Sequence, residues 1–473
     1  MAFDYKAFAL RKLASVGPKY MPFADVATED VPLSRLLRLS LFQITVGAAL
    51  VLLVGTLNRV MIVELDVPAT LVAVMLALPL LFAPFRTLIG HRSDQHRSAL
   101  GWRRVPYIWK GTMYQFGGFA IMPFALLVLS GYGEAIDAPR WIGLSSAALA
   151  FLLVGAGVHV VQTVGLALAT DLVRDEDQPK VVGLMYVMLL VGMVASALVY
   201  GALLDTYTPG RLIQVIQGTA VLTIALNLIA LWKQEPRDRA RAQVMETQKA
   251  VPFAEAWRGL VARPGMMRLM VMIGLGTFGF GMADVLLEPY GGQALGLSVA
   301  ETTRLTALLA GGTLVGFGIA SRVLGGSGSA VQLGRLGALI GIPGFLAIIL
   351  ASQMGGLPLF LAGTFATGLG AGLFGHATLT ATIRMAPGNR TGLALGTWGA
   401  VQATCAGIGV ALAGIVRDII VQMPGLGGLS AHAPYNYVFG IEIVFLLLAA
   451  FVAVSRRTKR SLVETDHKSV EVG

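Results

Sequence analysis

Twelve long apolar stretches dominate this sequence, and they restrict its fold more than any other feature. An α-helix needs about 20 mostly apolar residues to cross the roughly 30 Å hydrocarbon core of a bilayer. The stretches that meet this requirement cover residues 39–62, 67–90, 106–130, 141–170, 180–204, 210–232, 266–288, 301–323, 331–352, 356–383, 391–417 and 436–455. The pattern predicts an all-α integral membrane protein with 12 transmembrane helices.

The composition excludes a water-soluble protein. Hydrophobic residues make up 55% of the 473 residues before the 58 glycines are counted, and charged residues make up 13%. Soluble domains have about 45–50% apolar residues with glycine included, and about 25% charged residues. The single cysteine, Cys405, excludes an intramolecular disulfide and a structural cysteine–metal site. The net charge of +10 is explained by basic residues that concentrate on the cytoplasmic side of the membrane, so we expect no nucleic-acid partner.

The basic residues predict that both termini are cytoplasmic. In that orientation 28 lysines and arginines lie on the cytoplasmic side and three more lie near the cytoplasmic ends of helices. Only five lie on the outer side, namely Arg59, Arg140, Arg211, Arg304 and Arg417. This asymmetry satisfies the positive-inside rule. Residues 1–37 lack the short apolar core of a cleaved secretory signal.

The longest polar interruption divides the chain into six spans and six. The expected units are a cytoplasmic segment 1–38 with an amphipathic helix at 2–15, bundles at 39–232 and 266–455, a cytoplasmic linker 233–265 and a tail 456–473. A basic amphipathic helix suits the surface of an anionic membrane, and it is alternatively a docking element for partner proteins.

Weak internal symmetry relates the two halves. The fifth and eleventh spans both end in Gly-x-x-x-Asp, at Gly201–Asp205 and Gly414–Asp418. The fourth and tenth spans each carry one histidine at a similar depth, His159 and His376. Two parallel six-helix repeats around a central cavity describe the major facilitator fold. The alternative is a bundle of twelve helices without repeat symmetry.

The loop after the second span resembles the major facilitator signature of glycine, three residues, aspartate and then basic residues. It reads GHRSDQHRSALGWRR at 90–104, with Gly90, Asp94, Arg103 and Arg104 as the gating candidates. We expect Asp94 to form a contact at the seam between the halves. Gln95 departs from the signature, so an ordinary basic loop is the alternative.

Charged side chains inside a membrane are costly and usually functional. Residues such as Asp284 and Glu288 fall toward the outer ends of the predicted spans. Glu442 is deep, but it lies on the twelfth span, which is peripheral in this fold, and we expect a structural carboxyl that is either protonated or paired, with Arg417 as the candidate partner. The cavity is therefore expected to lack a carboxylate, which counts against an ion-coupled transporter.

Neutral polar residues remain as candidates for the cavity. Gln162 and Gln402 lie at depth together with His159 and His376. A neutral imidazole in an apolar wall either bonds a neighbouring helix or ligates a metal. The glycines at 368, 370, 372 and 375 either allow close helix packing or open a flat slot for a planar ligand. No nucleotide loop, catalytic triad or carboxylate pair is present, so we expect no enzyme activity.

Several uninterrupted strings resemble the PucC/LhaA light-harvesting assembly proteins of purple phototrophic bacteria, a branch of the major facilitator superfamily. The resemblance extends from about residue 5 to residue 455. The strings are VPLSRLLRLSLFQ (31–43), GTLNRVMIVEL (55–65), LPLLFAPFRTLIGHRSD (78–94), LGWRRVPYIWKGT (100–112), HVVQTVGLALATDL (159–172) and RLIQVIQG (211–218).

The resemblance implies an assembly factor in the bacterial inner (intracytoplasmic photosynthetic) membrane. Such a protein delivers bacteriochlorophyll to antenna polypeptides or chaperones them, with the core antenna slightly favoured over the peripheral antenna as the client. Implied partners are antenna polypeptides, the reaction-centre core complex, pigment-synthesis enzymes, the insertion machinery and the lipid bilayer. The pigment magnesium would bind His159 or His376, and no other metal or cofactor is expected. The alternatives are a scaffold without a pigment site and a secondary transporter of an apolar solute.

Overall fold

The computed structural model describes most of the membrane-spanning chain. It covers residues 31–81, 89, 93, 102, 104–131, 135, 137–174, 177–235, 258, 262–324, 328–354, 356–385, 391–423 and 430–453, without the side chains of 179 and 391–396. Three predictions lie outside these residues: the amphipathic helix at 2–15, the tail 456–473, and Gly90, Asp94 and Arg103 of the loop signature. Most of the linker 233–265 lies outside them as well.

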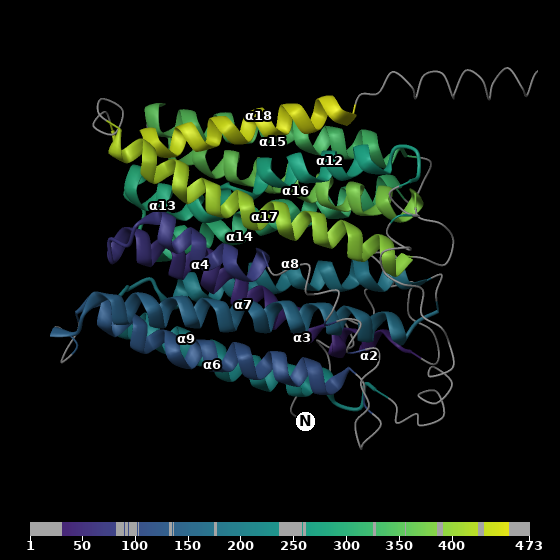
Figure 1. Cartoon of the computed structure of the whole chain (residues 1–473), viewed down its shortest axis with the longest axis horizontal. Coiled ribbons are helices and arrows are strands. Elements are labelled where there is room, and N and C mark those ends of the chain that lie inside the picture. Colours follow the sequence, from purple (N-terminus) through teal and green to yellow (C-terminus); the bar gives the residue numbers. More distant parts are fainter. Residues whose placement is uncertain are drawn as a thin grey trace, which may run out of the picture.

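The N-terminal half contains six helical segments that run side by side in the lower part of Figure 1. The first combines α2 (Leu33–Leu39), α3 (Leu41–Leu50) and two π-helices, η2 (Val51–Leu57) and η3 (Val60–Glu64). The others are α4 (Ala69–Leu81), α6 (Val105–Ser130), α7 (Arg140–Asp171), α8 (Gln178–Leu203) and α9 (Pro209–Leu231).

The C-terminal half repeats this arrangement in the upper part of Figure 1. Its helices are α12 (Met266–Gly281), α13 (Ala283–Leu295), α14 (Val299–Leu324), α15 (Ala330–Met354), α16 (Leu357–Met385), α17 (Thr391–Gln422) and α18 (Ala433–Ala453). Eleven helical segments of the described chain are long and apolar enough to cross a membrane, and α4 is a shorter apolar helix at the position of the second span. The all-α transmembrane prediction is confirmed.

Glycines set how closely neighbouring helices pack. A Cβ atom on Gly157 of α7 would lie 2.7 Å from the backbone nitrogen of Gln115 on α6. In the other half, a Cβ atom on Gly337 of α15 would lie 2.7 Å from the carbonyl oxygen of Gly370 on α16. Only glycine fits at these contacts, since small residues let helix backbones approach in the absence of a hydrophobic drive between helices.

The seventh span differs from its predicted form, because it is broken and longer. Helix α12 ends at Gly281, α13 starts at Ala283, and the span continues to Leu295 instead of 288. Glycines and a proline weaken the helical hydrogen-bonding pattern here, since glycine has low helix propensity and Pro289 lacks an amide hydrogen. Residues that the sequence placed near the end of this span therefore lie closer to its middle.

Candidate functional site

The two halves meet at one end of the bundle through a pair of equivalent contacts, and we call this end the Asp205 end. Arg304 at the start of α14 donates to the Asp205 carboxylate over 2.7 Å and to the carbonyl oxygen of Gly201 over 3.2 Å. In the repeat-related position, the Asp418 carboxylate accepts from the backbone amide of Thr70 at the start of α4 over 2.7 Å. Each aspartate thus ties the end of one helix to the beginning of a helix in the other half.

The glycine of each Gly-x-x-x-Asp motif makes this approach feasible. A Cβ atom on Gly414 would lie 2.5 Å from the Cβ atom of Ala73 and 2.6 Å from the carbonyl oxygen of Ala69. A Cβ atom on Gly201 would lie 2.6 Å from the Cγ atom of Arg304. The sequence shows this repeated motif as weak symmetry between the halves. In the structure, the motif lets helices of the two halves pack closely against each other.

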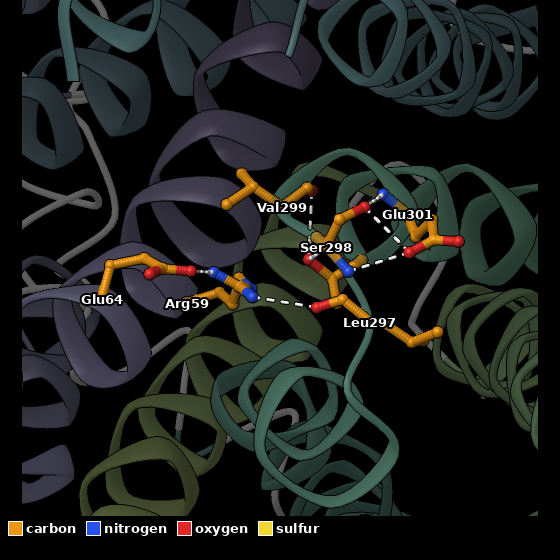
Figure 2. A network of polar contacts seen from close by, with 7 residues as sticks. Arg59, Glu64, Leu297, Ser298, Val299 and Glu301 are labelled. Atoms are coloured by element: carbon orange, nitrogen blue, oxygen red, sulfur yellow. Dashed lines mark hydrogen bonds and ion pairs between the residues drawn. The ribbon is translucent and has the colours of Figure 1, made fainter. Parts of the chain in front are cut away.

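A buried polar seam fills the space between these two contacts. The hydroxyls of Thr56 and Thr303 are 3.1 Å apart, and the Asn58 amide donates to the carbonyl oxygen of Val285 over 2.7 Å. Arg59 pairs with Glu64 and donates to the carbonyl oxygen of Leu297 over 3.0 Å (Figure 2). These hydrogen bonds close the Asp205 end between η2–η3 and the C-terminal half.

The sequence explains why α14 begins beside Arg59. Ser298 and Glu301 form a capping box, in which the Glu301 carboxylate accepts from the Ser298 amide over 2.8 Å (Figure 2). The hydroxyl of Ser298 accepts from the Glu301 amide over 3.3 Å. The helix start fixes the carbonyl of the preceding Leu297, which is the group that Arg59 contacts.

A central cavity of about 910 Å³ lies between the halves. Its volume is at the upper end of the range of about 300–1,000 Å³ for small-molecule sites. The lining is mainly apolar and aromatic, and it extends from Asp284 and Leu287 toward Arg104 and Thr170, which lie nearer the opposite end of the bundle. We call that opposite end the Arg104 end.

One face of α7 supplies the polar wall from the N-terminal half. The lining residues His159, Gln162, Thr163, Leu166 and Thr170 follow helical spacing, so they lie along a single stripe. The opposite side of α7 is apolar and packs in the core through Val154, Val161 and Leu168. The predicted placement of His159 and Gln162 at the cavity agrees with this geometry.

The C-terminal half contributes Gln402 and an aromatic wall. Gln402 lines the cavity from α17, and Phe280, Phe374 and Trp398 line it from three different helices. The ring of Trp398 meets that of Tyr186 on α8 edge-on, with centroids 6.3 Å apart. This contact joins the two halves across the cavity toward its Arg104 end.

His376 does not line the cavity, which contradicts the expectation that the two histidines occupy equivalent positions. It is 8% exposed and packs against Phe317 of α14, with ring centroids 4.2 Å apart. The residues of α16 that line the cavity are Thr367, Ala371, Phe374 and Gly375. Each residue of an α-helix is rotated by about 100° from the next, so His376 falls beside this stripe and faces α14.

The α16 glycines divide between helix packing and the cavity wall. Gly368 and Gly372 lie against the backbone of α14 at Leu309 and Thr313, and Gly370 lies against α15. Gly375 has open space where a Cβ atom would be, and it lines the cavity. Three of the four glycines therefore serve helix packing, and one widens the cavity.

Comparisons with known proteins agree with this architecture. The PUCC protein family matches residues 56–460. The chain is 70% identical to "Protein PucC" of Rhodobacter capsulatus over 452 residues, which cover 95% of this chain and 98% of that protein. It is 26% identical over 428 residues to the "Bacteriochlorophyll synthase 44.5 kDa chain" of Rhodobacter capsulatus, covering 89% of this chain and 94% of that one.

The chain belongs to the PUCC protein family. Its structure is similar to that of a bacterial homologue of the human lysosomal transporter Spinster, with a TM-score of 0.64 at 17% identity over 89% of this chain and 95% of the other. This likeness confirms the major facilitator fold for a PUCC-family protein. The alternative prediction, a bundle of twelve helices without repeat symmetry, is therefore wrong.

One carboxylate of this PUCC-family protein reaches the cavity, contrary to the expectation from the sequence. Asp284 is exposed and lines the cavity wall. The sequence placed it at the end of a span, but α13 continues for 11 residues beyond it, from 284 to 295. The absence of a cavity carboxylate therefore no longer counts against a coupled transporter.

Glu442 is not paired with Arg417, so that prediction is wrong. Arg417 instead donates to the Asp418 carboxylate over 2.8 Å and to the Gln293 amide oxygen over 2.9 Å. Glu442 is fully buried, and neither of its carboxyl oxygens has a hydrogen-bond partner among the residues that the structure describes. Burial without a donor favours the neutral form of a carboxyl group.

At the Arg104 end, Arg104 organises the entrance to the cavity. It donates to the Asp171 carboxylate over 3.0 Å and to the Ser93 hydroxyl over 2.7 Å. Glu235, which the sequence did not single out, accepts from the backbone amides of Arg104 and Val105 and so caps α6. Outside the spans, a hydrogen bond from Lys180 holds the pKa of Asp177 below its ordinary value.

Proposed function

We propose that this protein assists the assembly of light-harvesting antenna complexes by holding bacteriochlorophyll in its central cavity. The observation that carries the proposal is a large cavity whose mainly apolar wall contains one accessible imidazole, that of His159. Family membership supports a role in antenna assembly, and the name of the bacteriochlorophyll synthase relative supports this pigment as the cargo.

The residues of the cavity fit such a pigment. A large planar apolar molecule needs mainly apolar walls, which aromatic side chains and Gly375 provide. A neutral imidazole is a common metal ligand, so His159 would bind the magnesium through one ring nitrogen. The amides of Gln162 and Gln402 would donate hydrogen bonds to the polar substituents of the pigment. Among the described residues that line the cavity, His159 carries the one imidazole, so it is the side chain that we expect to ligate the magnesium.

The remaining parts of the proposal concern place and partners. The protein lies in the intracytoplasmic photosynthetic membrane with both termini in the cytoplasm, since basic residues concentrate on that side. It hands pigment to newly inserted antenna polypeptides and performs no chemistry on it. The Asp205 end then faces the periplasm, and the Arg104 end faces the cytoplasm and the machinery that supplies pigment.

The absorption spectrum of the gently purified protein tests the proposal. We expect a near-infrared band that elutes together with the chain on size exclusion. A colourless preparation that still retains antenna polypeptides would contradict it and establish the scaffold alternative instead. The polypeptides that elute with the chain also identify the client, for which the core antenna stays our prediction.

A further inference from the structure

Two carboxyl groups on one face of α13 connect the cavity with the closed Asp205 end. Asp284 and Glu288 are four residues apart in α13, so their side chains lie on the same face. Asp284 lines the cavity, whereas Glu288 is 3% exposed and lies at the contact between the halves. No function proposed above uses either group.

The site around Glu288 is shaped to hold a carboxyl group between the two halves. Thr306 of α14 donates to its Oε1 atom, and Gly55 of η2 lies so close that a Cβ atom there would clash with the same oxygen. The Oε2 atom is buried and has no hydrogen-bond partner within the described chain. A buried carboxylate with an unsatisfied oxygen is costly, whereas the neutral acid is tolerated.

The balance of nearby charges also favours the neutral acid. In the seam, Arg59 is the cation closest to Glu288. Its guanidinium lies against Gly292, which is one turn beyond Glu288 in α13. Its charge is already matched by its ion pair with Glu64. An ionised Glu288 would therefore leave one uncompensated negative charge in the closed seam.

A third carboxyl group lies behind the pair. Glu442 of α18 is fully buried beside the backbone of Ala283, and it lies within electrostatic range of Asp284. None of the three carboxyls forms an ion pair within the described ranges. The pair thus lies near a third carboxyl group, and Arg59, the cation that the seam contributes among the described residues, is already paired with Glu64.

We propose that Glu288 binds a proton that couples closure of the Asp205 end to protonation, and that Asp284 on the same face of α13 sets the pH at which Glu288 does so. When the end is closed, Glu288 carries a proton and its neutral acid fits between Gly55 and Thr306. When the end opens, water reaches Glu288, the proton passes to that water, and the hydrated carboxylate holds the halves apart. Closing takes up one proton from water again, so the cycle is balanced.

Other charged and titratable groups also lie near the pair. Arg59 and Glu64 form an ion pair with each other in the seam. Burial raises the pKa of Tyr207, beside Glu64, to about 12, so its phenol stays neutral. Glu442 stays buried on α18, and His159 faces the same cavity from α7.

Pulsed electron–electron resonance on the full chain in lipid nanodiscs tests the coupling. Spin labels at Thr206 and Ala431, which are exposed at the Asp205 end on opposite halves, report the opening of this end. The background carries Cys405→Ser, which leaves no native cysteine. We expect short distances at low pH and a growing population of longer distances as the pH rises.

Three variants show which carboxyl group produces the pH-dependent opening. Glu288→Gln mimics the neutral acid, so it should keep the short distances at every pH. Asp284→Asn removes a neighbouring negative charge, so the opening transition should move to lower pH. Glu301→Gln is the matched control, since it removes an exposed carboxylate at the same end and preserves the capping box, and it should respond as the parent does.

Two results would overturn the proposal: distances independent of pH in the parent, or a parent-like response in Glu288→Gln. Size-exclusion profiles and thermal unfolding show that each variant is folded. The experiment contains no pigment, so its failure and a failure of the proposed pigment function are distinguishable.

Discussion

Asp205 and Asp418 occupy equivalent positions in the two halves, and both reach across to the first two turns of a helix in the other half. His159 and His376 occupy similarly matched positions in the sequence, yet only His159 lines the cavity. The contrast shows that the repeat preserves contacts at helix ends but not contacts with the cavity. Contacts at helix ends depend on where a helix stops, whereas contacts with a cavity also depend on how the helix is rotated about its axis.

The histidine pair offers the largest expected effect. His159→Leu should lower the bacteriochlorophyll content per folded protein roughly tenfold or more, since it removes the proposed magnesium ligand. His376→Leu should keep the pigment, because His376 faces Phe317 and not the cavity. The ratio of near-infrared absorbance to protein measures both. Equal pigment loss in the two variants would show that the halves are equivalent at the cavity after all.

The motif glycines come next, and they should respond unequally. Gly414→Ala forces a Cβ atom against the backbone of α4, so we expect a loss of about 1–3 kcal/mol in stability. Gly201→Ala meets mainly the flexible side chain of Arg304, which can move, so the loss should be below about 1 kcal/mol. Thermal unfolding in detergent compares them. A larger loss for Gly201→Ala would contradict the contact geometry.

The motif aspartates should show the smallest difference. Asp418→Ala removes an acceptor for the amide of Thr70 at the start of α4, an effect of about 0.5–2 kcal/mol for helix caps, and it also removes the carboxylate to which Arg417 donates. Asp205→Ala breaks an exposed ion pair with Arg304, which is worth about 0–1 kcal/mol. Added salt should weaken the exposed Asp205–Arg304 pair more than the largely buried contacts of Asp418. A stronger salt dependence for the effect of Asp418→Ala than for that of Asp205→Ala would argue against this assignment.

Much of the architecture follows from the sequence because span length and apolar composition are properties of whole segments. The twelve spans, the division into halves and the family strings needed no knowledge of side-chain direction. His376 was misplaced because an error of one residue in matching α7 to α16 rotates a side chain by about 100°. Asp284 was missed because the continuation of the seventh span to Leu295 changed its depth.

Replacement of the proposed ligand by free imidazole tests the central claim most directly. In His159→Gly, the lost side chain leaves space in the cavity wall, and His376→Gly controls for the cost of about 1 kcal/mol of a glycine within a helix. We predict that His159→Gly is purified without pigment from cells grown normally, and that imidazole added during purification from pigment-containing membranes restores the near-infrared band. Full pigment content in His159→Gly without imidazole would contradict the account.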